Sequence, residues 1–180
     1  MPERDPLSEL LDRGRAEEQV SARARERALR RMAEDDARLA GTLVDLAERG
    51  SVVAVRTEAG RTHHGVLVAV GGDYCVLRTD AGAEPHLRLS AIATVRPRPG
   101  ERHPPAAGER ISSLDLRMLE VLAGVSAHRP EVTLVVRGGE VVSGQMVAVG
   151  VDVVTVRLAG AGREPCYVAA GAITEALIRP

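Results

Sequence analysis

The spacing of apolar residues changes near residue 50. Residues 7 to about 48 are predicted to be helical almost throughout, and from Leu29 onward apolar side chains recur every three or four positions. Gly41 is expected to break this segment into two helices, and Gly50 to end the second. An apolar stripe, interrupted by Asp36, runs through it: Leu29, Met32, Leu39, Leu43 and Leu46. Such a stripe packs on its own domain or forms a coiled coil with a second copy, and both alternatives stay open.

Beyond Gly50 the apolar period becomes two, which is typical of half-buried strands. We expect five short strands with Gly- or Asp-containing turns between residues 51 and 97. A stretch rich in Pro and Arg follows and predicts a semi-rigid linker. The pattern then starts again, with a helix over 112–129 that has Ser112 or Ser113 as a possible N-cap, and five more strands up to residue 180.

One hairpin sequence occurs twice in the chain. The segment GVLVAVGGDYCVLR begins at Gly65, and GQMVAVGVDVVTVR begins 79 positions later at Gly144. A repeat at a fixed offset with matched turns indicates two copies of one unit. The predicted fold is therefore mainly β with an N-terminal α part: two tandem five-stranded barrels, each preceded by a helix. The expected domains are an Arg-rich N-terminal helix (1–41), a first barrel (42–97), a linker (98–111) and a second barrel (112–180).

Each copy resembles the Sm/LSm fold, in which a helix caps a five-stranded SH3-like barrel. The resemblance lies in an apolar strand, a glycine turn and a second strand with a G-x-L pattern. In the first copy the matching residues are Val53, Val55, Gly60, Gly65, Leu67 and Val70. In the second they are Val132, Leu134, Gly139, Gly144, Met146 and Val149. The whole chain also resembles uncharacterised actinobacterial proteins sometimes labelled Fis-type regulators, although that label implies a C-terminal helix-turn-helix where this sequence predicts strands.

The Sm resemblance implies RNA binding but a degenerate uridine pocket. The family's pocket uses an Asp and an Asn after the second strand, and an Arg-Gly pair in the second motif. Asp73 and Asp152 lie near the loop position, where Asp also favours local turn bonding. Arg88 is kept without the following Gly, the second copy has neither residue, and the chain contains no Asn.

Composition narrows the class of protein. The hydrophobic share of 44% and the charged share of 27% are ordinary for a globular protein. The sequence shows neither a membrane span nor a signal peptide, so we expect a cytoplasmic protein with buried thiols at Cys75 and Cys166. Lys, Asn, Phe and Trp are absent, which indicates a GC-rich genome such as an actinobacterium's. With two tyrosines as the sole aromatic residues, a broad base-stacking platform is excluded.

No arrangement of residues argues for catalysis, so we expect a non-enzymatic protein without cofactor or metal. His63 and His64 are adjacent on a strand and point to opposite faces, which prevents them from chelating one metal. A zinc site from His64, Cys75 and His86 would need a particular strand register and a fourth ligand.

The segment 21–31 carries five arginines and one acid, Glu26. Guanidinium groups suit phosphates, which makes these arginines candidates for nucleic-acid contact. The full set of candidates is Arg23, Arg27, Arg30, Arg31, Arg88, Arg96 and Arg98. The net charge of −1 argues against a dedicated nucleic-acid binder and leaves a solvated, salt-bridged helix face as the alternative.

Two functions from different classes follow. The first is a nucleic-acid-associated module, with RNA favoured, that contacts phosphates without much base readout. The second is a protein–protein interaction scaffold that assembles through barrel edges and the N-terminal helix. We expect the free edges of the fourth and fifth strands to pair partly within the chain and to leave outer edges. These favour a homo-oligomer, with a dimer through the 29–46 stripe preferred.

The strand alternation also predicts which side chains form the core. In the first copy these are Val53, Val55, Leu67, Val76 and Ile92. In the second copy they are Val132, Leu134, Met146, Val154 and Ile173.

Overall fold

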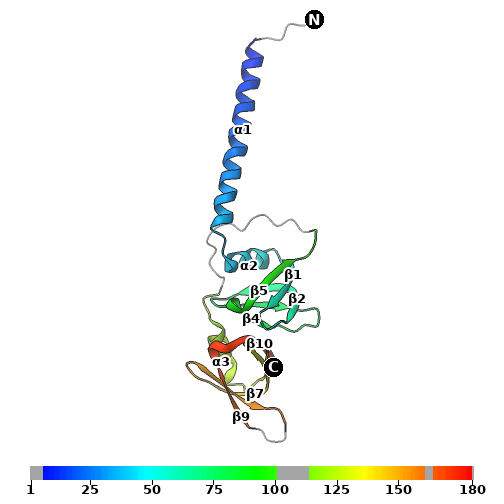
Figure 1. Cartoon of the computed structure of the whole chain (residues 1–180), viewed down its shortest axis with the longest axis vertical. Helices are drawn as coiled ribbons and strands as arrows, with labels where there is room; N and C mark the ends of the chain where they lie inside the picture. The colour runs from blue at the N-terminus through cyan, green and yellow to red at the C-terminus, as the bar shows by residue number, and fades with distance from the viewer. Residues whose placement is uncertain (1–5, 101–113, 161–163, 180) are drawn as a thin grey trace.

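The computed structural model describes residues 6–100, 114–160 and 164–179 of the 180-residue chain. Two helices come first, α1 (Pro6–Asp35) and α2 (Leu39–Glu48). Helix α1 rises away from the rest of the molecule, whereas α2 lies against the sheet (Figure 1). The predicted helical region is therefore confirmed. Most of the expected linker, together with Ser112 and Ser113, lies outside the described residues.

The break between the two helices is not at Gly41, as the sequence suggested. It lies at residues 36–38, where Arg38 has an extended backbone with φ −113° and ψ 147°. This turn lets α2 lay Leu43 and Leu46 on the sheet, where both are buried. Gly41 lies buried inside α2. The helix therefore breaks at residues 36–38, because the packing of α2 on the sheet outweighs the low helix propensity of Gly41.

The apolar stripe over 29–46 is consequently split in two. Leu29 and Met32 on α1 remain exposed, whereas Leu43 and Leu46 on α2 belong to the core. Gly50, at φ +61°, follows the end of α2 in the left-handed conformation that glycine favours, as expected.

Within the described residues, ten strands, a third α-helix and two short 3-10 helices follow. The first five strands are β1 (Val52–Thr57), β2 (Thr62–Val70), β3 (Tyr74–Arg78), β4 (His86–Arg88) and β5 (Ile92–Pro97), with a short 3-10 helix η1 (Leu89–Ala91) before β5. After α3 (Met118–Ser126) come β6 (Glu131–Val136), β7 (Val141–Val149), β8 (Val153–Leu158), β9 (Pro165–Ala169), η2 (Ala170–Ala172) and β10 (Ile173–Arg179). All of these strands were predicted, with boundaries shifted by a few residues at most.

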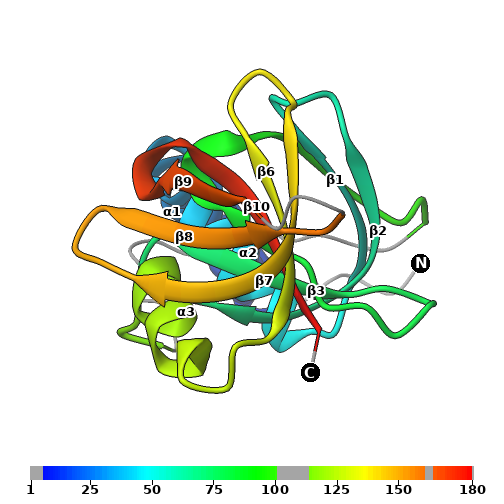
Figure 2. The same ribbon diagram turned by 90° about the horizontal axis from the view of Figure 1, so that it is seen from below.

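The strands form one open antiparallel sheet in the order β5-β1-β2-β3-β4-β10-β6-β7-β8-β9. The sequence predicted two tandem barrels. They are not confirmed, because β4 pairs with β10 and joins the first half (α2 and β1–β5) to the second half (α3 and β6–β10) in one continuous sheet (Figure 1). The view from below shows β7 and β8 of the second half side by side (Figure 2). The expected pairing between a fourth-strand edge and a fifth-strand edge inside the chain is confirmed by the contact of β4 with β10.

The internal repeat is confirmed by strand register. Val53 lies opposite Gly65 in the first half, and Val132 lies opposite Gly144 in the second, with the same offset of 79. Each second strand also carries an irregularity at the equivalent place, after Leu67 and after Met146. From β4 onward the offset becomes 81, because Val76 and His86 on neighbouring strands are ten positions apart, whereas their equivalents Thr155 and Tyr167 are twelve positions apart.

Gly65 and Gly144 recur for a steric reason. A Cβ at Gly65 would run into the backbone carbonyl of Arg78 on β3, and a Cβ at Gly144 would meet the equivalent carbonyl of Arg157 on β8. The close approach of the second and third strands therefore needs a residue without a side chain in both halves.

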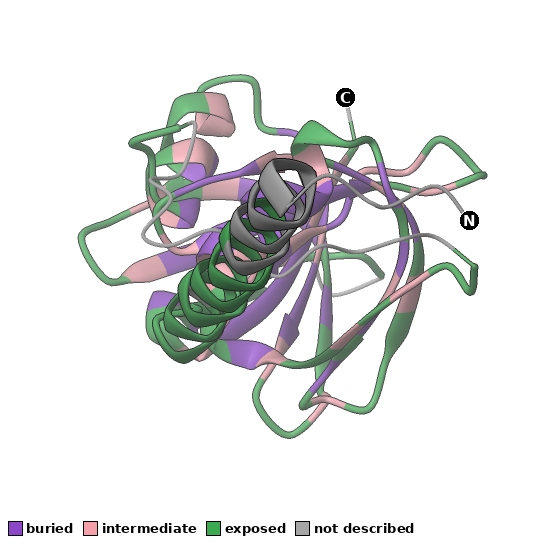
Figure 3. Cartoon of the chain, turned by 90° about the horizontal axis from the view of Figure 1, so that it is seen from above, coloured by how far each residue is buried: buried purple, intermediate pink, exposed green. Residues whose placement is uncertain are grey.

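The buried side chains form two clusters, one mainly from each half. Figure 3 shows that buried segments lie along the strands, whereas the described part of α1 is exposed. Nine of the ten predicted core residues are buried, and Ile92 is half-buried. Val76 was assigned to the wrong cluster, since its side chain packs with the second one. Its neighbours Cys75 and Leu77 fill the first cluster instead, so the prediction slipped by one residue on β3.

Leu67 tests this assignment of faces. Leu67→Ala should lower the free energy of unfolding by about 2–5 kcal/mol, because the side chain is fully buried. Val68→Ala, on the neighbouring exposed position, should change it by less than about 1 kcal/mol. Denaturant unfolding of both variants measures the difference, and equal effects would show that the faces of β2 are assigned wrongly.

Candidate functional site

The contact between β4 and β10 brings charged residues from the two halves together. Leu87 lies opposite Glu175 and His86 opposite Ala176. We call this contact the seam. Two polar clusters lie at the seam, one around Arg88 and one around Glu175, and each joins residues that are at least 80 positions apart in the sequence.

Arg88 on β4 binds groups of the second half. Its Nε donates to the carbonyl of Ile173 at 2.6 Å, and one Nη donates to the carbonyl of Ala170 at 3.0 Å. The other Nη forms an ion pair with Asp73 at 2.8 Å. The side chain is 15% exposed. Its donors are therefore used to hold η2 and the start of β10 against the first half.

Arg88 thus differs from the role that the sequence suggested for it. A guanidinium that is already bound to two carbonyls and a carboxylate is poorly placed to bind a phosphate. The seam also explains why the second copy has Ala169 at the equivalent position of β9. Strand β9 lies at the outer edge of the sheet, where no η2 is present to be held.

Asp73 has a larger role than the local turn bonding expected of it. One carboxylate oxygen binds Arg88, and the other accepts from the backbone N–H of Met118 at 2.7 Å. Met118 is the first residue of α3, so Asp73 caps a helix of the other half. The side chain of Glu120 accepts from the backbone N–H of Arg117 at 2.6 Å and caps the same end. Helix α3 consequently begins at Met118 and not near Ser112.

Glu175 on β10 is the centre of the second cluster, and its side chain is 4% exposed. It receives three contacts from the first half. The hydroxyl of Thr57 donates to Oε1 at 2.7 Å, and Nε2 of His63 lies 3.0 Å from Oε2. Nε of Arg61 lies 3.1 Å from the same Oε2. The buried carboxylate is thereby paired and hydrogen-bonded, which is the condition for keeping a charge inside a protein.

These contacts decide the ionisation of Glu175. Burial alone raises the pKa of its carboxyl group, but the hydrogen bonds from His63 and Thr57 and the charges of His63 and Arg61 outweigh burial and lower the pKa below its usual value. The carboxylate therefore stays ionised and holds the seam at neutral pH.

A pocket of about 150 Å³ lies beside this cluster, between the halves, and His63, Thr133 and Glu175 are among its lining residues. The arrangement of Thr57, Glu175 and His63 does not suit nucleophilic catalysis. The carboxylate stands between Thr57 and His63, so the imidazole is not placed to take the proton of the hydroxyl. This cluster is built to hold two halves together.

The suggested zinc site does not form. Cys75 is buried in the first core, and burial raises the pKa of its thiol to about 12, which disfavours the thiolate that a metal requires. His86 packs against Tyr74 on the opposite face of the sheet, with ring centroids 5.7 Å apart. Among the described residues, no group of three or more His, Cys, Asp or Glu side chains could hold a metal ion.

Four arginines of α1 share one face of the helix. The residues concerned are Arg23, Arg27, Arg30 and Arg31, and all four are exposed. At 100° per residue their positions span about 100° of the helix circumference. Arg27 donates to the carbonyl of Arg23 at 3.2 Å, and Arg30 lies 3.8 Å from Glu26. A shallow groove between Val20 and Arg30 runs along this face.

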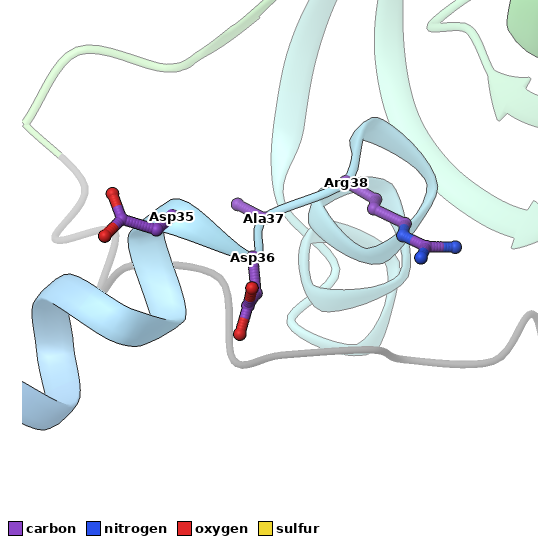
Figure 4. Close-up of a pocket in the computed structure, with 4 residues that line it drawn as sticks. All are labelled: Asp35, Asp36, Ala37 and Arg38. Atoms are coloured by element: carbon purple, nitrogen blue, oxygen red, sulfur yellow. The ribbon is translucent and has the colours of Figure 1, made fainter.

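The remaining candidate arginines lie on the body of the molecule. Arg96 is on β5 and Arg98 follows it, and both are exposed. Because α1 rises away from the body, the structure does not gather the arginines into one cluster (Figure 1). A hollow lined by Asp35, Asp36, Ala37 and Arg38 lies at the turn between α1 and α2. Its charged side chains point in different directions, so they do not converge on a ligand (Figure 4).

Asp73 and its repeat equivalent Asp152 provide a matched pair of variants. Asp73→Ala should lower the free energy of unfolding by about 1–3 kcal/mol, because it removes the acceptor of the Met118 N–H and of one Nη of Arg88. Asp152→Ala should change it by less than about 0.5 kcal/mol, since Asp152 is exposed. Denaturant unfolding at low protein concentration measures both, and equal losses would contradict the role given to Asp73.

Glu175 predicts how stability depends on pH. Its folded pKa is lower than its unfolded value, so its contribution is fully present above about pH 4.3 and is lost as the pH falls through the folded pKa. Glu175→Gln should therefore flatten the decline of the free energy of unfolding between pH 5 and pH 3. Urea unfolding at a series of pH values measures this decline. An unchanged slope would show that Glu175 does not carry the effect.

No helix in the described ranges is long and apolar enough to cross a membrane. Comparison with known proteins gives no further guide, because no family model, no curated protein and no solved structure matches the chain significantly.

Proposed function

We propose that this protein is a non-enzymatic nucleic-acid-associated module that contacts phosphates through the arginine face of α1. The observation that carries the proposal is the exposed row formed by Arg23, Arg27, Arg30 and Arg31 on a helix that projects from the body (Figure 1). A projecting helix can lie along a phosphate backbone without interference from the sheet.

The chemistry of this face favours phosphate contact over base recognition. Guanidinium groups bind phosphate oxygens in a bidentate manner, and each neutralised phosphate releases condensed counterions. The described surface offers little for stacking, because Tyr74 is buried and Tyr167 on β9 is the one exposed tyrosine among the described residues. Binding should consequently be salt-dependent and weakly selective for sequence.

We further propose that the two halves are Sm-like units, which favours RNA over DNA as the ligand. The support is the repeated order of helix, three strands, short fourth strand, 3-10 helix and fifth strand in each half. The residues nearest to the family's uridine pocket, Asp73 and Arg88, serve the seam in this chain. The body then acts as a rigid base for α1 and leaves nucleic-acid contact to the helix.

A second candidate function is that of an interaction scaffold. The observation in its favour is that the ten-stranded sheet ends in two edge strands, β5 and β9. Unpaired edge strands offer backbone donors and acceptors to another chain. This function does not require the arginine face.

Replacing the four arginines of the exposed face tests the first proposal. The variant R23Q/R27Q/R30Q/R31Q should bind labelled single-stranded RNA at least tenfold more weakly than the unmodified chain at low salt. It should also show a shallower dependence of log K on log salt concentration, because fewer counterions are released. Fluorescence anisotropy across a salt series measures both quantities.

Arg25 supplies the matched control, since it is exposed on the same helix but points away from this face. Arg25→Gln should leave both the affinity and the salt slope nearly unchanged. Absence of RNA binding by the unmodified chain, or equal effects of the two variants, would contradict the proposal and favour the scaffold.

A further inference from the structure

The seam shows how one copy of the repeat docks on another. The first half provides an acceptor surface, which consists of the β2–β3 turn, strand β4 and the face of β3 that carries Tyr74 and Val76. The second half provides a donor surface, which consists of the start of α3 and strand β10. Both surfaces are buried where they meet.

The turn and the helix start make specific contacts. The backbone N–H of Gly72 donates to the carbonyl of Leu116 at 2.9 Å, and Asp73 caps Met118. The side chain of Met118 is 1% exposed and packs in one cluster with Tyr74 and Val76. The helix start therefore fits against the turn through both backbone and apolar contacts.

A second donor surface recurs at the start of α2. Helices α2 and α3 begin 79 residues apart, each after an arginine with an extended backbone, Arg38 and Arg117. Leu39 is thus the equivalent of Met118, but it is 42% exposed where Met118 is 1% exposed. Strand β5 shows the same difference, since Ala93 and Thr94 are exposed whereas their equivalents Thr174 and Glu175 on β10 are buried.

A second acceptor surface recurs on the last strands. Val151 and Asp152 occupy the turn positions equivalent to Gly72 and Asp73, and Tyr167 on β9 is equivalent to His86 on β4. Val151 is 96% exposed and Tyr167 is 71% exposed. Two large apolar side chains on an uncovered edge are the kind of surface that a partner covers.

The two uncovered surfaces lie at opposite ends of the body, with α2 at one end and β9 at the other (Figure 1). We propose that a second copy of this chain docks head to tail, with the start of α2 and strand β5 of one copy against the β7–β8 turn and strand β9 of the next. Transferring the register of the seam places Val95 opposite Tyr167 and Thr94 opposite Val168.

The outer contact differs from the seam in its polar groups. Ala169 stands where the seam has Arg88, and Thr94 stands where the seam has Glu175. The contact between copies then depends on strand pairing, on Leu39, Val151 and Tyr167, and on capping of the Leu39 N–H by Asp152. It is weaker than the seam and reversible with concentration. A head-to-tail contact closes into a ring or extends as a filament, according to the rotation between copies.

The test uses two full-length variants that each lose one surface. Leu39→Asp removes the donor surface and Tyr167→Asp the acceptor surface, and both residues are exposed, so neither variant should lose its fold, as circular dichroism checks. Light scattering coupled to size exclusion should find the unmodified chain assembled at tens of micromolar and each variant monomeric. Mixing the two variants should give a one-to-one heterodimer, because a single intact pair of surfaces remains.

Val141→Asp is the control, since Val141 is 48% exposed but lies at the start of β7, outside both surfaces, and it should assemble like the unmodified chain. A monomeric unmodified chain would overturn the proposal, as would variants that still assemble or a mixture that stays monomeric. Assembly that is abolished by Leu29→Asp with Met32→Asp, but not by Tyr167→Asp, would assign the contact to α1 and also overturn it.

Discussion

The antiparallel pairing of β4 with β10 is the constraint on which the structure depends. A five-stranded unit of this kind leaves unpaired edges on its fourth and fifth strands, and unpaired edges invite association with other chains. Because the chain contains two copies of the unit, the fourth strand of the first copy (β4) pairs with the fifth strand of the second (β10) within one chain. The cores remain separate clusters, yet the backbone forms a single sheet, so the chain is one body with two cores.

The seam also explains why the two copies differ where they do. Arg88 and Glu175 are each surrounded by groups of the other half, and the equivalent outer positions carry Ala169 and Thr94. Asp73 caps a helix, whereas Asp152 is exposed. The two copies therefore differ in sequence at the positions where one half contacts the other. The exposed arginine face of α1, where we propose phosphate contact, takes no part in the contact between the halves.

Much of the fold could be predicted from the sequence, because strand period, turn residues and the repeated glycines are local signals. The pairing of inner edges followed from the repeat itself. The seam clusters could not be predicted, since Arg88 binds the carbonyls of two residues more than 80 positions away, through a register that no local pattern reveals. Two errors have the same origin. Val76 was assigned to the wrong face of β3, and the helix break was placed at Gly41. In both cases tertiary packing determines the outcome, and the local sequence does not reveal it.

Calorimetric unfolding of the full chain tests the central claim most directly. If the seam makes the two halves one cooperative body, the chain should unfold in a single transition whose calorimetric enthalpy equals its van't Hoff enthalpy. The measurement belongs at a protein concentration low enough to exclude association between copies. Two resolved transitions, one for each half, would contradict the account.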